Sequence, residues 1–79
     1  MAAPTTASEL DKLTMRIDYA SATVEYYGYA ATGTATSAAF WRIRRRTLDA
    51  NGRTTAMQSA NGTDDFISVW DNRASLVYS

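Results

Sequence analysis

The sequence predicts a small, mainly β domain: an antiparallel meander or barrel-like sheet of about five strands, with one short C-terminal helix (about 64–72) and a flexible N-terminal arm. Three observations favour this fold class. Several short runs alternate apolar and polar residues, two Asn-Gly pairs bracket one of these runs, and the apolar spacing becomes helical near the C-terminus. The 79 residues suffice for one domain, which we assign to residues 11–79 behind an arm at 1–10.

The predicted arm contains the only proline of the chain, Pro4, and few large apolar side chains. This composition is typical of a flexible segment, because nothing in it has to be buried. Strict alternation of apolar and other residues begins at Leu13 and continues to Ala20, which predicts a half-buried strand with one apolar side. That side consists of Leu13, Met15, Ile17 and Tyr19.

A second strand is predicted over residues 23–30. Both of its sides carry apolar residues, so we expect both faces of this strand to be covered. Gly28 lies within it, and a glycine inside a strand marks either a bulge or the close approach of a neighbouring backbone. The apolar residues are Val24 and Tyr26 on one side and Tyr27 and Tyr29 on the other.

The middle of the chain predicts a β-hairpin. Residues 31–39 are small and carry no periodic pattern, so they are expected to form a loop before a strand over 40–48. Asn51-Gly52 is a strong turn signal, since both residues tolerate positive φ, and the returning strand is expected over 53–60. On the first strand of this hairpin, Trp41 and Ile43 are expected to face inward, and Arg42, Arg44 and Arg46 outward.

Near the C-terminus, apolar residues recur at a helical spacing, which predicts the short helix at about 64–72. Thr63 is placed as its N-cap, and two acidic residues follow it where the helix dipole favours negative charge. A closing strand is expected over 74–78. The apolar face of the helix consists of Phe66, Val69 and Trp70.

The core available to one copy is small. Only 22 residues have large apolar side chains. Burying each contributes roughly 1.5–3 kcal/mol, whereas ordering the chain costs about 1.5 kcal/mol per residue, so the two nearly cancel. Because the chain has no Cys and no His, disulfides and thiolate or imidazole metal sites cannot add stability. We therefore expect homo-oligomerisation, with some of the five Tyr and two Trp buried by a second chain.

No enzymatic activity is expected. The chain lacks the commonest general base, His, and the thiolate nucleophile, and it contains no nucleotide-binding or nucleophile-elbow motif. The helix dipole accounts for the adjacent carboxylates Asp64 and Asp65. No cofactor, metal or membrane partner is expected, and a net charge of zero argues against a protein whose main role is to bind a polyanion.

Half of the positive charge lies within residues 42–46. On a strand, Arg42, Arg44 and Arg46 project from one face about 7 Å apart, a spacing that matches successive phosphates of a nucleic-acid strand. Tyr27 and Tyr29 on a neighbouring strand would then complete a base-stacking platform. The alternative, which we favour, is that the arginine stems cover a solvent face or pair with acids of an adjacent subunit.

The chain also contains, in order, Tyr27-x-Tyr29-Ala30, Gly33, Trp41-x-Ile43-x-Arg45, Ala60-Asn61-Gly62 and Phe66-x-x-x-Trp70-Asp71-Asn72-Arg73-Ala74-Ser75-Leu76-x-Tyr78. In this pattern, which covers roughly residues 16–79, it resembles a group of short proteins encoded in tailed-bacteriophage and prophage genomes. The resemblance implies phage origin, and phage origin combined with the physical properties of the chain predicts a place in the virion, assembled in the host cytoplasm. It supplies no catalytic residues.

Phage origin and a small β domain favour a structural component of the virion, in first place a capsid decoration or cement protein and alternatively a tail or neck protein. Its partners would be other copies of the chain and virion proteins such as the major capsid protein. A different class is a small β-barrel that binds single-stranded nucleic acid through the three arginines, and an inhibitor of a host factor is a third. The residues predicted to form the interface are Pro4, Tyr27, Tyr29, Arg42, Arg44 and Arg46.

Overall fold

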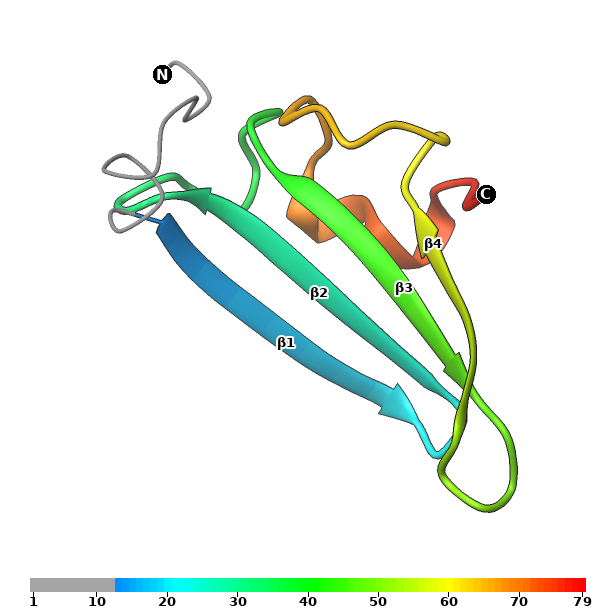
Figure 1. Cartoon of the computed structure of the whole chain (residues 1–79). Coiled ribbons are helices and arrows are strands. Elements are labelled where there is room, and N and C mark those ends of the chain that lie inside the picture. The colour runs from blue at the N-terminus through cyan, green and yellow to red at the C-terminus, as the bar shows by residue number, and fades with distance from the viewer. Residues whose placement is uncertain (1–12) are drawn as a thin grey trace.

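The computed structural model describes residues 13–79, which form one antiparallel sheet and a short 3₁₀ helix (Figure 1). Four strands lie in the order β1-β2-β3-β4, each paired with the next one along the chain. The arm predicted over 1–10, with Pro4, lies outside the described residues. The elements are β1 (Leu13–Ser21), β2 (Val24–Ala31), β3 (Arg42–Leu48), β4 (Thr54–Ser59) and helix η1 (Trp70–Ser75).

The C-terminal segment covers one face of the sheet, the face turned away from the viewer in Figure 1, which we call the inner face. Trp41 and Ile43 point to this face and are almost completely buried, as their alternation with the arginines predicts. The core is small, because few of the large apolar side chains in residues 13–79 are buried. Those that are buried are Tyr26, Trp41, Ile43, Leu48, Trp70 and Tyr78.

The predicted hairpin between β3 and β4 is confirmed. Its loop is organised by the carboxylate of Asp49, whose Oδ1 accepts hydrogen bonds from the backbone N–H groups of Asn51 (2.9 Å) and Arg53 (3.0 Å). Gly52 has a φ of +79°, the left-handed conformation that the turn requires and that glycine adopts without a steric penalty.

The predicted helix at 64–72 is wrong; a 3₁₀ helix of six residues begins only at Trp70. Thr63 does accept a hydrogen bond from the N–H of Asp65, as an N-cap would, but the chain does not continue into a helix. The backbone of Ser68 instead exchanges two hydrogen bonds of 2.9 Å with Trp41. This pairing keeps the segment extended, so a tertiary contact overrides the local apolar spacing.

The sheet is open and has four strands, so the expectation of about five strands in a barrel-like sheet is wrong in this detail. Residues 74–78, predicted to be a closing strand, complete η1 and then form one isolated bridge, between Tyr78 and Ala60. Ser79 adds two backbone hydrogen bonds to Ser59. The C-terminus therefore lines the end of β4 without adding a strand or bringing β4 to β1.

Arg73 anchors η1 to the first strand. Its Nε donates to Oδ2 of Asp18 in β1 at 2.9 Å, and its guanidinium lies over the ring of Trp70, 4.6 Å from the centroid. The polar side of β1 is therefore the side that faces the C-terminal segment. The register of the β1–β2 pair places Asp18 beside Tyr26 on the inner face, and the contact with Arg73 is consistent with this orientation.

Tyr78 makes folding stability sensitive to alkaline pH. Its hydroxyl donates to the carbonyl of Arg73 at 2.8 Å, and burial, reinforced by Tyr26, raises its pKa to about 12 although Arg45 and Arg73 oppose the shift. In the unfolded chain the pKa is about 10. Above pH 10 the unfolded chain loses this proton while the folded chain keeps it, so the stabilisation is complete below pH 10 and falls as the pH rises towards 12.

We therefore expect the urea midpoint of the wild type to fall between pH 9 and pH 11.5, and to fall less steeply in Tyr78→Phe. Tyr19→Phe is the control, because Tyr19 is 71% exposed; it should lose stability with pH as the wild type does. A Tyr78→Phe profile parallel to the wild type would contradict the prediction.

Candidate functional site

The face of the sheet opposite η1 carries a row of exposed apolar side chains on β1, and on the same face Asp64, from the segment before η1, reaches the arginines of β3. Residues paired across neighbouring strands point to the same face, and here Met15 pairs with Tyr29 and Ile17 with Tyr27. The apolar side of β1 therefore faces outward. The expectation that it is buried in the chain is wrong, since Met15, Ile17 and Tyr19 are 52%, 39% and 71% exposed.

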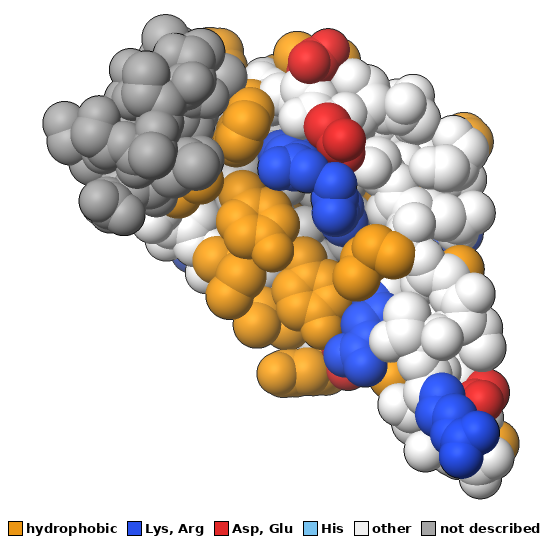
Figure 2. All heavy atoms as spheres, in the orientation of Figure 1, with side chains coloured by type: hydrophobic (Ala, Val, Ile, Leu, Met, Phe, Trp, Pro, Cys, Tyr) orange, Lys and Arg blue, Asp and Glu red, His pale blue; other side chains and the backbone are white. Residues whose placement is uncertain are grey.

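This open face has an apolar half and a basic part. Figure 2 shows the apolar side chains gathered over β1 and β2, with blue arginine groups beside them. We name the apolar half the apolar patch and the arginines of β3 the arginine stripe. The apolar patch consists of Met15, Ile17, Tyr19, Tyr27 and Tyr29 on β1 and β2, together with Met57 on β4, and the arginine stripe on β3, between Met57 and the tyrosines, consists of Arg42, Arg44 and Arg46.

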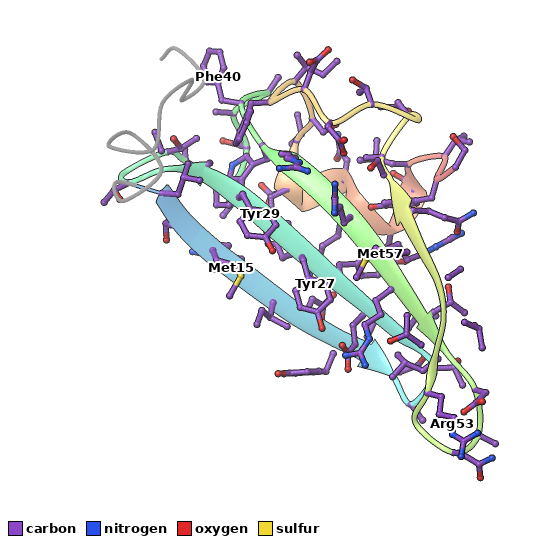
Figure 3. All side chains as sticks on the ribbon, viewed as in Figure 1. Met15, Tyr27, Tyr29, Phe40, Arg53 and Met57 are labelled. Carbon is purple, nitrogen blue, oxygen red and sulfur yellow. The ribbon has the colours of Figure 1, made fainter. Side chains whose placement is uncertain are left out.

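A hollow of about 120 Å³ lies on the open face, over β2, β3 and β4. Its lining comes from three strands, with Tyr27 and Tyr29 from β2, Arg44 from β3 and Met57 from β4. In Figure 3 the two tyrosines lie between Met15 on one side and Met57 on the other. The open face thus has an exposed apolar row along β1 and a hollow over the three strands that follow it.

Carboxylates within the chain already hold the arginine stripe. Oδ1 of Asp64 lies 3.1 Å from Nη2 of Arg44 and 3.4 Å from Nη2 of Arg42. Oε1 of Glu25 lies 3.1 Å from Nη1 of Arg46. The stripe therefore presents little net charge, and it lies flat on the sheet, with the Nε atoms of Arg42 and Arg44 buried and without a hydrogen-bond partner in residues 13–79.

The same contacts shift the ionisation of their neighbours. Hydrogen bonds from Ser59 and Arg44, with the positive charges of Arg42 and Arg44, lower the pKa of Asp64. The hydroxyl of Tyr27 donates to Glu25, and this bond to a carboxylate raises the pKa of Tyr27. Asp64 thus stays ionised at neutral pH and Tyr27 stays protonated, so neither group is prepared for proton transfer.

The fourth arginine of the cluster, Arg45, lies on the inner side of the sheet. Its Nη2 donates to Oε1 of Gln58 at 2.6 Å, and its guanidinium stacks 4.8 Å from the ring centroid of Tyr78. It thus covers the edge of the core with its stem and takes no part in the open face.

The structure brings together five of the six residues predicted to form an interface: Tyr27, Tyr29, Arg42, Arg44 and Arg46 share the open face. Pro4 lies outside the described residues. Sequence reasoning missed Met15, Ile17, Tyr19 and Met57 as exposed members of this face. The alternation along β1 marked the first three as one side of a strand, but it did not tell which side faces the core.

Neither a metal-binding cluster nor a membrane-spanning helix is present in the described part of the chain. No group of three or more acidic side chains there lies close enough to hold a metal ion. No helix within residues 13–79 is long and apolar enough to cross a membrane. The sequence matches no family model, no curated protein and no solved structure.

Proposed function

We propose that this protein is a structural subunit of a larger assembly, without catalytic activity, and that it acts by burying its open face against protein. One observation carries the proposal: the apolar side of β1 faces outward, on the same face as Tyr27 and Tyr29. A contiguous apolar surface is costly to expose to water and marks a contact site. The composition also fits, because Tyr, Met and Arg are enriched at protein interfaces while Lys and Glu are depleted.

Together with the resemblance to short phage proteins, this supports a place in the virion. We propose a capsid decoration or cement protein, assembled onto the particle in the host cytoplasm, that contacts copies of itself and the major capsid protein. A position in the tail or neck is the alternative. In each location the repeated arrangement of subunits would supply the burial that a single small core lacks.

The test is the protein content of purified particles of the phage whose genome carries the gene. We expect the protein in these particles, in a copy number set by the symmetry of the capsid or tail. Ile17→Asp should reduce its incorporation at least about tenfold, because a charge in a desolvated contact costs well above 1 kcal/mol. Asn72→Asp, which adds the same charge at an exposed position on η1, should be incorporated like the wild type.

The proposal fails if the protein is absent from particles, or if Ile17→Asp is incorporated as well as Asn72→Asp. Binding of single-stranded nucleic acid is the competing function, since the arginine stripe does share a face with Tyr27 and Tyr29. Because Asp64 and Glu25 occupy the arginines, we expect no retardation of an oligonucleotide at low salt. Retardation that is lost when all three arginines become Ala would favour the competing function.

A further inference from the structure

We propose that a second copy of the chain covers the open face, packed face to face about a two-fold axis, with the β1 row of each copy seated over the hollow of the other. This inference rests on the proposed function and identifies the partner at the same surface. Three properties of the open face support it: its shape, its charge and the small core behind it.

The shape of the face is self-complementary. Met15, Ile17 and Tyr19 form an exposed row on β1, and the hollow over β2, β3 and β4 measures about 120 Å³. A cavity of about 150 Å³ accepts a benzene ring, so this hollow has room for one apolar side chain of similar size. In a two-fold contact both copies use the same patch. If the axis runs between the row and the hollow, the row of each copy therefore lies over the hollow of the other.

The charge of the face also fits a copy of itself. The three arginines of the stripe face two carboxylates of their own chain, Asp64 and Glu25. Two such surfaces can approach without bringing strong like charges together. An acidic protein or a polyanion would have to displace Asp64 and Glu25 from the arginines before it gained from their charge, so these occupants are disfavoured.

The small core gives the energetic reason. The apolar patch holds six large side chains, as many as residues 13–79 bury among themselves. Packing two patches together, as the sheets of a β-sandwich pack, creates a second core between the copies. Trp70 and Tyr78 already cover the inner face. Of the two faces of the sheet, the open face therefore has more exposed apolar surface to bury.

The first experiment is sedimentation equilibrium of the full chain. We expect a dimer at about 100 µM and a shift towards monomer on dilution. Ile17→Asp should weaken dimerisation at least about 100-fold, because a two-fold contact contains each substitution twice. Asn72→Asp should dimerise as the wild type does, and circular dichroism should show that both variants are folded.

The second experiment uses the absence of cysteine in the chain, which makes an introduced cysteine a unique probe. Within one copy, β1 and β4 are separated by three strand spacings, about 14 Å, too far for a disulfide. A mixture of Met15→Cys and Met57→Cys proteins should therefore form mixed-disulfide dimers on mild oxidation. A mixture of Met15→Cys and Asn72→Cys should not, since Asn72 lies on the covered side of the sheet.

A chain that stays monomeric at about 100 µM would overturn the inference, as would a dimer that survives Ile17→Asp, or cross-links that form equally well to Asn72→Cys. A monomer whose incorporation into particles still depends on Ile17 would overturn the second copy as partner and leave the proposed function standing. A dimer that depends on the open face but is absent from particles would support the second copy as partner and overturn the proposed function.

Discussion

Gly28→Ala is expected to lower the free energy of unfolding by about 3 kcal/mol, because the new methyl group has no room. A Cβ at this position would lie 2.4 Å from Cε3 and 2.5 Å from Cζ3 of Trp70, and 3.2 Å from Cε3 of Trp41. The Trp70 ring cannot yield easily, since it is buried and Arg73 lies over it. Urea denaturation followed by tryptophan fluorescence measures the loss.

Gly33→Ala is the matched control. Gly33 has a φ of +90° but no atom within 4 Å of an added Cβ, so the same substitution there costs only the backbone strain of positive φ, about 1 kcal/mol. The two variants separate a steric cause from a conformational one. A Gly28→Ala variant as stable as Gly33→Ala would show that Trp70 does not press on β2.

The sequence marked Gly28 as either a bulge or a site of close approach, and the structure decides between them. Gly28 pairs in regular register with Arg16 on one side and Ile43 on the other, so no bulge lies there. The close approach comes from the ring of Trp70 rather than from a backbone. No local pattern connects two residues so far apart in the chain, which is why the partner could not be predicted.

Alternation and turn chemistry were enough to predict the four strands of the sheet, but they also predicted a closing strand over 74–78 that does not form. Each observed strand lies within a residue or two of its predicted range, because period-two patterning and the Asn51-Gly52 turn act over short distances. The C-terminal helix failed for the opposite reason. Phe66, Val69 and Trp70 have helical spacing, but the backbone of Ser68 pairs with Trp41, a residue far away in the sequence.

In the candidate site, too, short-range patterns could be predicted from the sequence and long-range contacts could not. Tyr27, Tyr29 and the arginine stripe could be placed on one face, because strand period and hairpin register fix their relation. Two facts could not be predicted. Asp64 reaches the stripe from a segment outside the sheet, and β1 turns its apolar side outward while Asp18 on its other side binds Arg73. Both depend on how the C-terminal segment lies on the sheet.

Trp41→Ala is expected to lower the free energy of unfolding by about 4 kcal/mol. Trp41 is fully buried, its ring packs against Trp70 with centroids 5.8 Å apart, and its Nε1 donates to the carbonyl of Ala35 at 2.9 Å. The substitution leaves a cavity in a core of few large side chains and removes one of the two hydrogen bonds that the carbonyl of Ala35 accepts, the other coming from the N–H of Ala38. Thermal denaturation followed by far-ultraviolet circular dichroism measures the effect.

A domain of this length has a total stability of about 4–12 kcal/mol, so Trp41→Ala should be unfolded or nearly so unless a partner stabilises it. Phe40→Ala is the control, because Phe40 is the neighbouring aromatic residue and is 42% exposed; it should cost less than about 1 kcal/mol. Trp41→Phe keeps most of the ring and removes the bond to Ala35, and should fall between them. Equal losses of unfolding free energy in Trp41→Ala and Phe40→Ala would mean that the core does not lie on the inner face. The open face could then not be regarded as the solvent-exposed side of the sheet.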